Sequence, residues 1–232
     1  MYFARRALPD RYLEPWREQF GELVRPALRP GVQILDVGAG RAPTLAPSCR
    51  PPGCYYVGLD VSAEELQLAV PGSYDEVWVR DAAVRIPELE DRFDLILSYQ
   101  VLEHVKPLDV VLQNLHSYLR PGGRFVALLS GKFSVFGVIN SLVPQQLGVS
   151  AMAKFLGRAP DSVFPAYYHR CWYGAMEQML RAWGAKEIRP LYRGAGYFAF
   201  SSVLQRLYVA YENWAARGKR NLATHYLVVA HR

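Results

Sequence analysis

The chain has 232 residues, of which 51% are hydrophobic and 21% are charged. This length and composition fit one α/β domain over 1–232 and exclude a disordered chain. The net charge of +6 comes mainly from arginines that are scattered along the chain without a dense run, so nucleic-acid binding is not expected.

Three cysteines, Cys49, Cys54 and Cys171, form an odd set without metal-like spacing. We therefore expect reduced thiols, a cytoplasmic protein and no metal site. Cys171 lies close to the expected site, where we predict a small buried side chain rather than a reactive thiol. Arg5 and Arg6 follow the first four residues at once, so no signal peptide is expected. No apolar run is long enough to span a membrane.

The first 30 residues carry apolar side chains at a spacing of three to four, which predicts an N-terminal helical segment over 1–30 that ends at Pro30. After it, short apolar runs alternate with helical patterns. Strands are predicted at 33–37, 55–59, 77–79, 93–98, 124–129, 186–193 and 224–229, and helices at 62–69, 108–119, 172–183 and 198–217. This alternation predicts a Rossmann-like, doubly wound α/β fold with a mostly parallel sheet of seven strands and helices on both faces.

Four prolines after the first strand predict a short or irregular first crossover helix. Between the fifth strand and the next helix, residues 131–168 are dense in apolar and aromatic side chains. We interpret this insertion as a lid or substrate wall. Packing on the body of the domain, a subunit interface and peripheral contact with a membrane surface remain alternatives. The helix at 198–217 carries an apolar face whose spacing predicts a core position, formed by Val203, Leu204, Leu207, Tyr208, Tyr211 and Trp214.

The first strand runs directly into Gly38-Ala39-Gly40. Residues without side chains let backbone N–H groups approach a ligand closely, and a strand followed by such a turn is how doubly wound proteins hold nucleotide-like ligands. A plain βα turn has the same pattern, so the turn alone leaves both interpretations open.

Two ligand classes suit this turn. A dinucleotide requires a third glycine three residues after Gly40, where this chain has Pro43. Asp60 ends the second strand and can accept from ribose hydroxyls in either case. Asp81, followed by Ala82, comes after the third strand and can accept from an adenine amine beside an apolar wall. These anchors indicate a ligand with adenine, ribose and a charged tail but no pyrophosphate.

Five segments together resemble the class I S-adenosylmethionine-dependent methyltransferases, most closely the group that contains the ubiquinone-biosynthesis O-methyltransferases. They are Leu35-Asp36-Val37-Gly38-Ala39-Gly40, Gly58-Leu59-Asp60, Asp81-Ala82, Tyr99-Gln100-Val101-Leu102-Glu103-His104-Val105 and Leu119-Arg120-Pro121-Gly122-Gly123. The resemblance is strong over about residues 30 to 130, and after that only the strand–helix–strand tail is similar. It implies S-adenosylmethionine as the methyl donor.

The resemblance also implies a role for each matching residue. Asp36, Gly38 and Gly40 would line the methionine moiety, and Asp60 would take the ribose hydroxyls. Asp81 and Ala82 would hold the adenine, and Tyr99 would lie beside the sulfonium. The family commonly has a cysteine in place of Ala39 and a third glycine near 42, whereas this chain has Arg41-Ala42-Pro43.

Methyl transfer from a sulfonium needs alignment of donor and acceptor, exclusion of water and, for a hydroxyl or ammonium acceptor, a general base. His104 and His169 are the candidate bases, and anchoring of a loop or a helix end is the alternative for each. Tyr167 and Tyr168 precede His169 and could stack on a planar substrate. Glu103 could polarise a neighbour or cap the turn that follows it.

The leading hypothesis is a methyltransferase that acts on oxygen or nitrogen of an aromatic, lipid-like or secondary-metabolite acceptor, as a monomer or a homodimer. One alternative is an NAD(P)-dependent oxidoreductase on the same kind of sheet. The other is a non-catalytic protein that binds S-adenosylmethionine and assembles with a partner.

Overall fold

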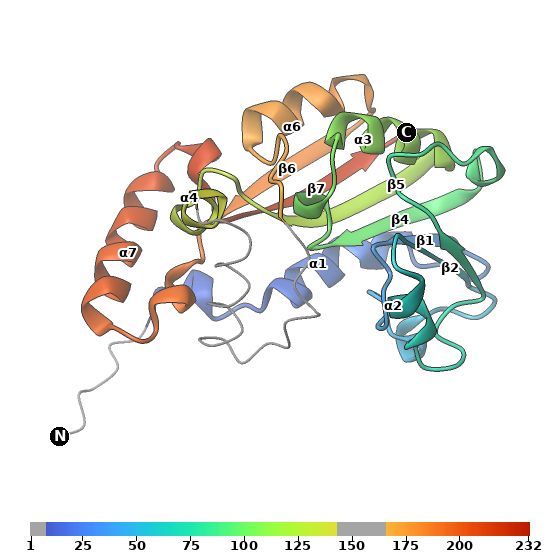
Figure 1. Ribbon diagram of the computed structural model, residues 1–232, viewed down its shortest axis with the longest axis horizontal. Helices are drawn as coiled ribbons and strands as arrows, with labels where there is room; N and C mark the ends of the chain where they lie inside the picture. Colours follow the sequence, from blue (N-terminus) through green and yellow to red (C-terminus); the bar gives the residue numbers. More distant parts are fainter. Residues whose placement is uncertain (1–7, 143–165) are drawn as a thin grey trace.

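The computed structural model describes residues 8–142 and 166–232, and seven strands in these ranges form one sheet in the order β3-β2-β1-β4-β5-β7-β6 (Figure 1). The strands are β1 (Gln33–Val37), β2 (Tyr55–Asp60), β3 (Glu76–Val79), β4 (Phe93–Tyr99), β5 (Leu119–Ser130), β6 (Lys186–Leu191) and β7 (His225–His231). Strands β1 to β5 pair in parallel, while β7 is antiparallel to both β5 and β6. The predicted mostly parallel sheet of seven strands is confirmed.

Helices lie on both faces of this sheet, with α3 and α6 on one side and α1 on the other (Figure 1). The α-helices are α1 (Trp16–Val24), α2 (Ala63–Gln67), α3 (Leu108–Tyr118), α4 (Val135–Leu142), α6 (Tyr173–Met179) and α7 (Ser202–Ala215). Short 3-10 helices are η1 (Asp10–Tyr12), η2 (Arg25–Ala27), η3 (Pro47–Cys49), η4 (Pro87–Leu89), η5 (Leu102–His104), η7 (Leu180–Ala182), η8 (Ala195–Phe198) and η9 (Arg220–Leu222). The doubly wound architecture is therefore confirmed.

Alternate residues of the strands supply two hydrophobic clusters, one on each face. Leu35 and Ile96 belong to the cluster that includes the buried side chains of α3 and α6. Ile34 and Leu97 belong to the other cluster, which includes Phe20 of α1. Successive side chains of a strand point to opposite faces of the sheet. A strand that is buried on both faces therefore has a continuous apolar run in its sequence, and such runs predict these strands.

The crossover between β1 and β2 contains only η3, as its prolines predict. Ser62 accepts a hydrogen bond from the N–H of Glu65 at 3.2 Å and so caps α2. Strand β5 begins at Leu119, five residues before its predicted start, because Leu119 pairs with Phe93 ahead of a register shift. Residues 120–123 therefore form an irregularity within β5.

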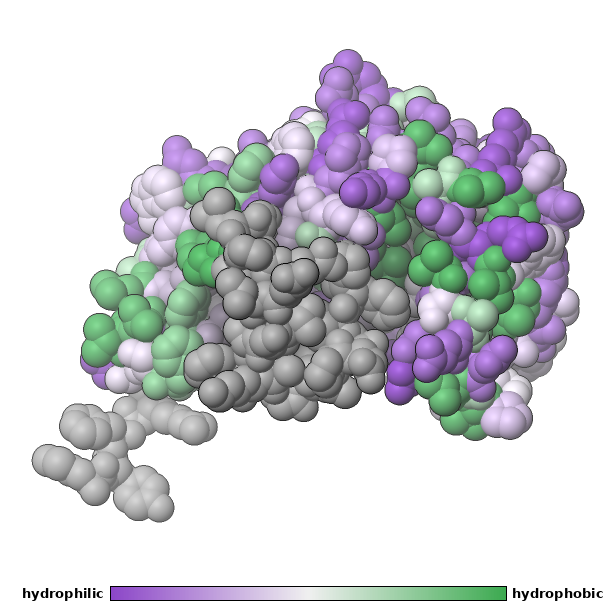
Figure 2. Space-filling view, viewed as in Figure 1, coloured by the Kyte–Doolittle hydropathy of each residue, from purple (hydrophilic) through white to green (hydrophobic). Residues whose placement is uncertain are grey.

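The prediction of a core-facing apolar stripe on α7 is wrong for most of its residues, and among them only Tyr208 is buried. Val203 and Leu207 are each 63% exposed and Trp214 is 50% exposed, whereas the buried side chains of α7 are Tyr208, Glu212 and Ala215. Figure 2 shows hydrophobic side chains over the end of the molecule that α7 forms. The apolar spacing was identified correctly, but a helical repeat does not tell which side of the helix faces the sheet.

The N-terminal segment is partly helical in its described residues, and it is fixed to the C-terminal half. Arg11 Nε donates to the carbonyl of Tyr192 at 2.8 Å, and the hydroxyl of Tyr12 donates to the carboxylate of Glu212. Glu212 is buried and also accepts from the N–H of Gly194 at 2.6 Å. These bonds hold η1 beside the end of β6 and α7.

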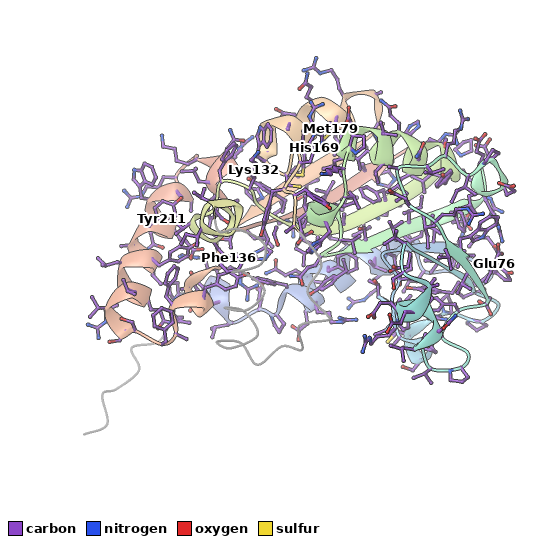
Figure 3. All side chains as sticks on the ribbon, in the orientation of Figure 1. Glu76, Lys132, Phe136, His169, Met179 and Tyr211 are labelled. Atoms are coloured by element: carbon purple, nitrogen blue, oxygen red, sulfur yellow. The ribbon has the colours of Figure 1, made fainter. Side chains whose placement is uncertain are left out.

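The predicted insertion at 131–168 is described only in part, at 131–142 and 166–168. Its first part forms α4, on which Phe136 (labelled in Figure 3) stacks on Tyr197 of η8 with ring centroids 4.2 Å apart. The remainder, 143–165, lies outside the described residues, so the lid or substrate wall stays a prediction. No helix in the described ranges combines the length and the apolar character needed to span a bilayer.

Candidate functional site

The glycine turn follows β1 and is held against the end of β2. The N–H groups of Gly38 and Ala39 donate to the carbonyl of Leu59 at 2.8 and 3.2 Å. Gly38 has a φ of 72°, and a Cβ atom on it would lie 2.1 Å from Cγ2 of Val101. Both the backbone conformation and the contact with Val101 therefore require glycine at position 38.

Asp36 is fully buried beneath this turn. Its Oδ2 accepts from the N–H of Thr44 at 2.7 Å and from the hydroxyl of Tyr56 at 2.8 Å. Its Oδ1 has no hydrogen-bond partner among the described residues. Burial raises the pKa of Asp36 from 3.8 to about 6, against the opposing effect of the hydrogen bonds from Thr44 and Tyr56. One carboxylate oxygen thus fixes the loop, and the other is left for a donor.

The raised pKa of Asp36 predicts a pH-dependent stability. The folded protein binds the Asp36 proton more tightly than the unfolded chain does. The protonated carboxyl therefore contributes its full stabilisation below the unfolded pKa, and this stabilisation is lost as the pH rises through the folded pKa. Between about pH 4 and pH 7.5 the contribution should fall by about 2.5 kcal/mol. Urea unfolding at several pH values should show this decline in the unliganded wild type and not in Asp36→Asn. A difference between the two proteins that stays constant with pH would contradict it.

Asp60, at the end of β2, lies directly against the glycine turn. Its Oδ2 accepts from the N–H of Gly40 at 2.9 Å, and its Oδ1 accepts from the N–H of Ser62 at 2.8 Å. Each carboxylate oxygen has a second lone pair, so these bonds position the group without using up its capacity to accept hydroxyls. Arg41 departs from the family pattern, and its guanidinium forms an ion pair with Glu65 at 2.5 Å on the outside of the turn.

Asp81 and Ala82 follow β3, the next strand outward. Asp81 is exposed, and its Oδ1 accepts from the N–H of Ala83 at 2.8 Å. Ala82 is 8% exposed, and its carbonyl accepts from Nδ2 of the buried Asn114 at 2.9 Å. Asp36, Asp60 and Asp81 thus stand at or just beyond the carboxyl ends of three adjacent parallel strands, β1, β2 and β3. The structure brings these predicted cofactor residues to one edge of the sheet.

Tyr99 ends β4 at the same edge, on the other side of β1 from β2. Its ring meets Phe20 of α1 edge-on with centroids 5.2 Å apart, and the guanidinium of Arg17 lies 5.3 Å from the centroid of the Tyr99 ring. Burial raises the pKa of the Tyr99 hydroxyl, and Arg17 opposes this rise. The ring is held by α1, so the N-terminal segment forms part of the candidate site.

The loop after β4 carries His104 and Glu103. His104 is half-buried in η5, with its backbone N–H bonded to the carbonyl of Val101 at 2.8 Å. Glu103 is 3% exposed, and its Oε1 accepts from the hydroxyl of Ser130 at 2.7 Å. The Glu103 side chain therefore ties η5 to the end of β5. No local sequence pattern indicates this bond, because Ser130 lies 27 positions away from Glu103.

His169 makes a specific backbone contact. Its Nδ1 accepts from the N–H of Leu108, the first residue of α3, at 3.1 Å. An acceptor Nδ1 makes Nε2 the protonated nitrogen of a neutral imidazole, which favours positioning over proton abstraction. Tyr167 is 44% exposed, and Nζ of Lys106 lies 3.9 Å from the centroid of its ring. Tyr168 is 3% exposed and belongs to the core. Contacts of these tyrosines with a substrate stay predictions.

Cys171 is buried, as predicted, with Sγ 3.7 Å from the carbonyl of Leu102. Burial, and next the charge of Glu103, raise the pKa of its thiol. Because the thiolate is the reactive form, we expect Ellman's reagent to modify the exposed Cys49 in the native protein and Cys171 only after unfolding in urea. Mass spectrometry of the labelled peptides assigns the sites. Native labelling of Cys171 as fast as that of Cys49 would refute this expectation.

Within residues 8–142 and 166–232, His, Cys, Asp and Glu side chains form no group of three or more that could hold a metal ion. The site assembled from the described residues is therefore an edge of carboxylates, glycines and one tyrosine. It is bordered by α1 and by the loop that carries His104.

The chain is similar in sequence and in fold to known methyltransferases. A family model described as a methyltransferase domain matches residues 4–197. The ubiquinone biosynthesis O-methyltransferase of Chelativorans sp. (strain BNC1) is 29% identical over 113 residues, which cover 47% of this chain and 44% of that protein. The match thus spans less than half the length of that relative.

Solved structures with low sequence identity share the fold. A SAM-dependent methyltransferase from Archaeoglobus fulgidus has a TM-score of 0.57 and 16% identity, over 96% of this chain and 97% of that one. Phosphoethanolamine N-methyltransferase 2 of Haemonchus contortus, in complex with S-adenosyl-L-methionine, has a TM-score of 0.57 and 14% identity, over 94% of this chain and 52% of that one. By the extent of the family match and the shared fold, this chain belongs to the methyltransferase-domain family within the class I S-adenosylmethionine-dependent superfamily.

Proposed function

We propose that this protein transfers a methyl group from S-adenosylmethionine to an oxygen or nitrogen atom of a small-molecule acceptor. The observation that carries the proposal is the position of Asp60, whose carboxylate is oriented by the N–H groups of Gly40 and Ser62. A carboxylate fixed beside a glycine turn suits two neighbouring ribose hydroxyls. Asp81 with Ala82 would take the adenine.

The other end of the donor would lie between the glycine turn and Tyr99. Oδ1 of Asp36 is buried without a partner among the described residues, and it would accept from the ammonium group of the methionine moiety, as the family resemblance implies. Such a cation would stabilise the ionised form of Asp36 and lower its pKa toward the ordinary value. Tyr99 would contact the sulfonium with a ring that Phe20 and Arg17 keep in place.

The chemistry asks little of the protein beyond alignment, because S-adenosylmethionine supplies a methyl group on a good leaving group. The chain would align the acceptor for in-line displacement and exclude water from it. We assign His104 as the base that accepts the proton of a hydroxyl or ammonium acceptor. We assign His169 to positioning, since its Nδ1 accepts from the backbone of Leu108. Tyr167 would border the acceptor.

Three measurements test the proposal. Isothermal titration should detect binding of S-adenosylhomocysteine, and a fluorescence titration should detect none of NADH, because Pro43 stands where the dinucleotide turn needs glycine. Transfer of radiolabelled methyl groups to a panel of phenols, amines and hydroxy acids should then show turnover that His104→Gln reduces. Binding of NADH in place of S-adenosylhomocysteine would identify an oxidoreductase. Donor binding without turnover of any acceptor would favour a non-catalytic partner protein.

A further inference from the structure

Three side chains from distant parts of the chain meet at the far end of the same sheet edge. Trp16 begins α1, which lies against β5 (Figure 1). His225 begins β7 and pairs with Ser130, the last residue of β5. The Trp16 and His225 rings are 3.9 Å apart between centroids, and the guanidinium carbon of Arg193 lies 5.9 Å from the centroid of the Trp16 ring.

Most polar atoms of this cluster are buried and lack hydrogen-bond partners among the described residues. They are Nε1 of Trp16, Nε and Nη1 of Arg193, and both ring nitrogens of His225. His225 is 1% exposed as a whole. A buried polar group left unpaired costs about 1–3 kcal/mol, and a native structure contains few of them. Several such groups close together around the Trp16 ring indicate a place for a ligand that supplies the missing partners.

The cluster offers hydrogen-bond donors and a positive charge. Burial, with the charge of Arg193 as a smaller cause, lowers the pKa of His225 to about 3, so its imidazole is neutral at pH 7 and carries one N–H. Trp16 can only donate, and the guanidinium of Arg193 donates and keeps its charge. Arg193 makes one hydrogen bond to a described residue, from Nη2 to the carbonyl of Tyr12 at 3.2 Å.

No ion pair within 4 Å neutralises Arg193 among the residues that the structure describes. Burial lowers the pKa of Arg193, and the negative charge of Glu14 opposes this shift with a smaller effect. Glu14 is exposed, and its carboxylate accepts from Nε2 of Gln19 at 2.8 Å. Arg193 is half-buried, and the Nε and Nη1 atoms of its guanidinium are themselves buried. A guanidinium fork in this position, beside two further N–H donors, matches the oxygens of a carboxylate or a phosphate.

We propose that Trp16, Arg193 and His225 bind an anionic group, a carboxylate or a phosphate, of the methyl acceptor. The assignment to the acceptor rests on the proposed function, because it places the transferred methyl group beside Tyr99 at the end of β4. His225 lies on β7, two strand spacings or about 10 Å from β4. An acceptor that spans this distance would have its anionic group held at one end and its nucleophilic atom presented at the other.

The test is a titration of the full chain with three probes at constant ionic strength: inorganic phosphate, benzoate and, as a neutral control, benzamide. The readout is the imidazole NMR signal of His225, assigned by its loss in His225→Gln. We expect a saturable shift with at least one anion and none with benzamide, and the response to phosphate compared with benzoate identifies the preferred anion. No saturable shift with either anion would overturn the proposal.

Variants identify the donors. Arg193→Gln should weaken anion binding at least tenfold, and Trp16→Phe, which removes only the indole N–H, should weaken it by a smaller factor. Arg189→Gln is the matched control, since Arg189 lies on β6 in an exposed ion pair with Glu187 at 3.0 Å, and it should bind like the wild type. Anion binding that persists unchanged in both Arg193→Gln and Trp16→Phe would overturn the proposal.

A parallel calorimetric titration with S-adenosylhomocysteine separates this subsite from the proposed function. The donor should bind to Arg193→Gln as it does to the wild type. If the donor bound to neither protein while the anion titrations succeeded, the proposed function would fail and the anion site would stand. If the donor bound to both proteins and neither anion bound, the anion site would be refuted and the proposed function would stand.

Discussion

Replacing Gly38 by alanine is expected to destabilise the fold by about 3 kcal/mol or more and to abolish binding of S-adenosylhomocysteine. The φ of 72° costs an alanine about 1–2 kcal/mol, and overpacking adds about 1–3 kcal/mol. The added Cβ would meet Cγ2 of Val101 at 2.1 Å and Cγ1 at 2.6 Å. The turn or the Val101 side chain must therefore shift, and a shift of the turn disturbs its hydrogen bonds to the carbonyl of Leu59. Denaturant unfolding and isothermal titration measure the two effects.

Gly72→Ala is the matched control, because Gly72 has a φ of 81° and nothing within 4 Å of an added Cβ. It should show the backbone cost alone and bind the ligand normally. Adding Val101→Ala to Gly38→Ala should restore stability in part, since two of the three close contacts disappear while Cβ of Val101 remains at 2.9 Å. If Gly38→Ala cost no more stability than Gly72→Ala, the close approach of the turn to Val101 would be refuted.

The second large effect is expected at Asp60. Asp60→Asn should weaken S-adenosylhomocysteine binding on the order of 100-fold, because hydrogen bonds to a charged group contribute about 1.5–3 kcal/mol each. The amide keeps the size of the side chain but cannot accept through both ends at once. Its NH₂ group would also face the N–H of Gly40 or that of Ser62, where two donors repel. Calorimetric titration at fixed salt measures the loss.

Asp91→Asn controls for the removal of a surface charge. Asp91 is exposed, forms an ion pair with Arg232 and has a positive φ that asparagine tolerates. The affinity of the Asp91→Asn variant for S-adenosylhomocysteine should equal that of the wild type. Equal affinities in Asp60→Asn and the wild type would remove Asp60 from the site, and with it the main support for an adenosyl ligand.

The fold and the cofactor edge were predictable because their signals are local. The strand at Gln33–Val37 and the glycines that follow it occupy adjacent positions, and the topology of a parallel sheet brings the carboxyl ends of neighbouring strands together. Asp60 and Asp81 could therefore be placed at the same sheet edge as Gly40 without coordinates. The prolines after β1 likewise showed that its crossover contains no long helix.

What the sequence could not supply depends on contacts between distant positions. The bond from Ser130 to Glu103 and the meeting of Trp16 with His225 join residues far apart in the chain, and no periodicity records them. The apolar face of α7 has the same spacing whether it is covered or exposed, so the spacing predicts a core position for Leu207 that the structure does not show. His169 was proposed as a base, and only its bond to Leu108 shows that Nδ1 accepts.

The most direct test of the central claim is a crystal structure of the full chain with S-adenosylhomocysteine. The account predicts the ribose hydroxyls within hydrogen-bond distance of Asp60, the adenine amine at Asp81, the amino group near Oδ1 of Asp36 and the sulfur facing Tyr99. A ligand bound away from the carboxyl ends of β1 and β2, or one whose ribose makes no contact with Asp60, would contradict it.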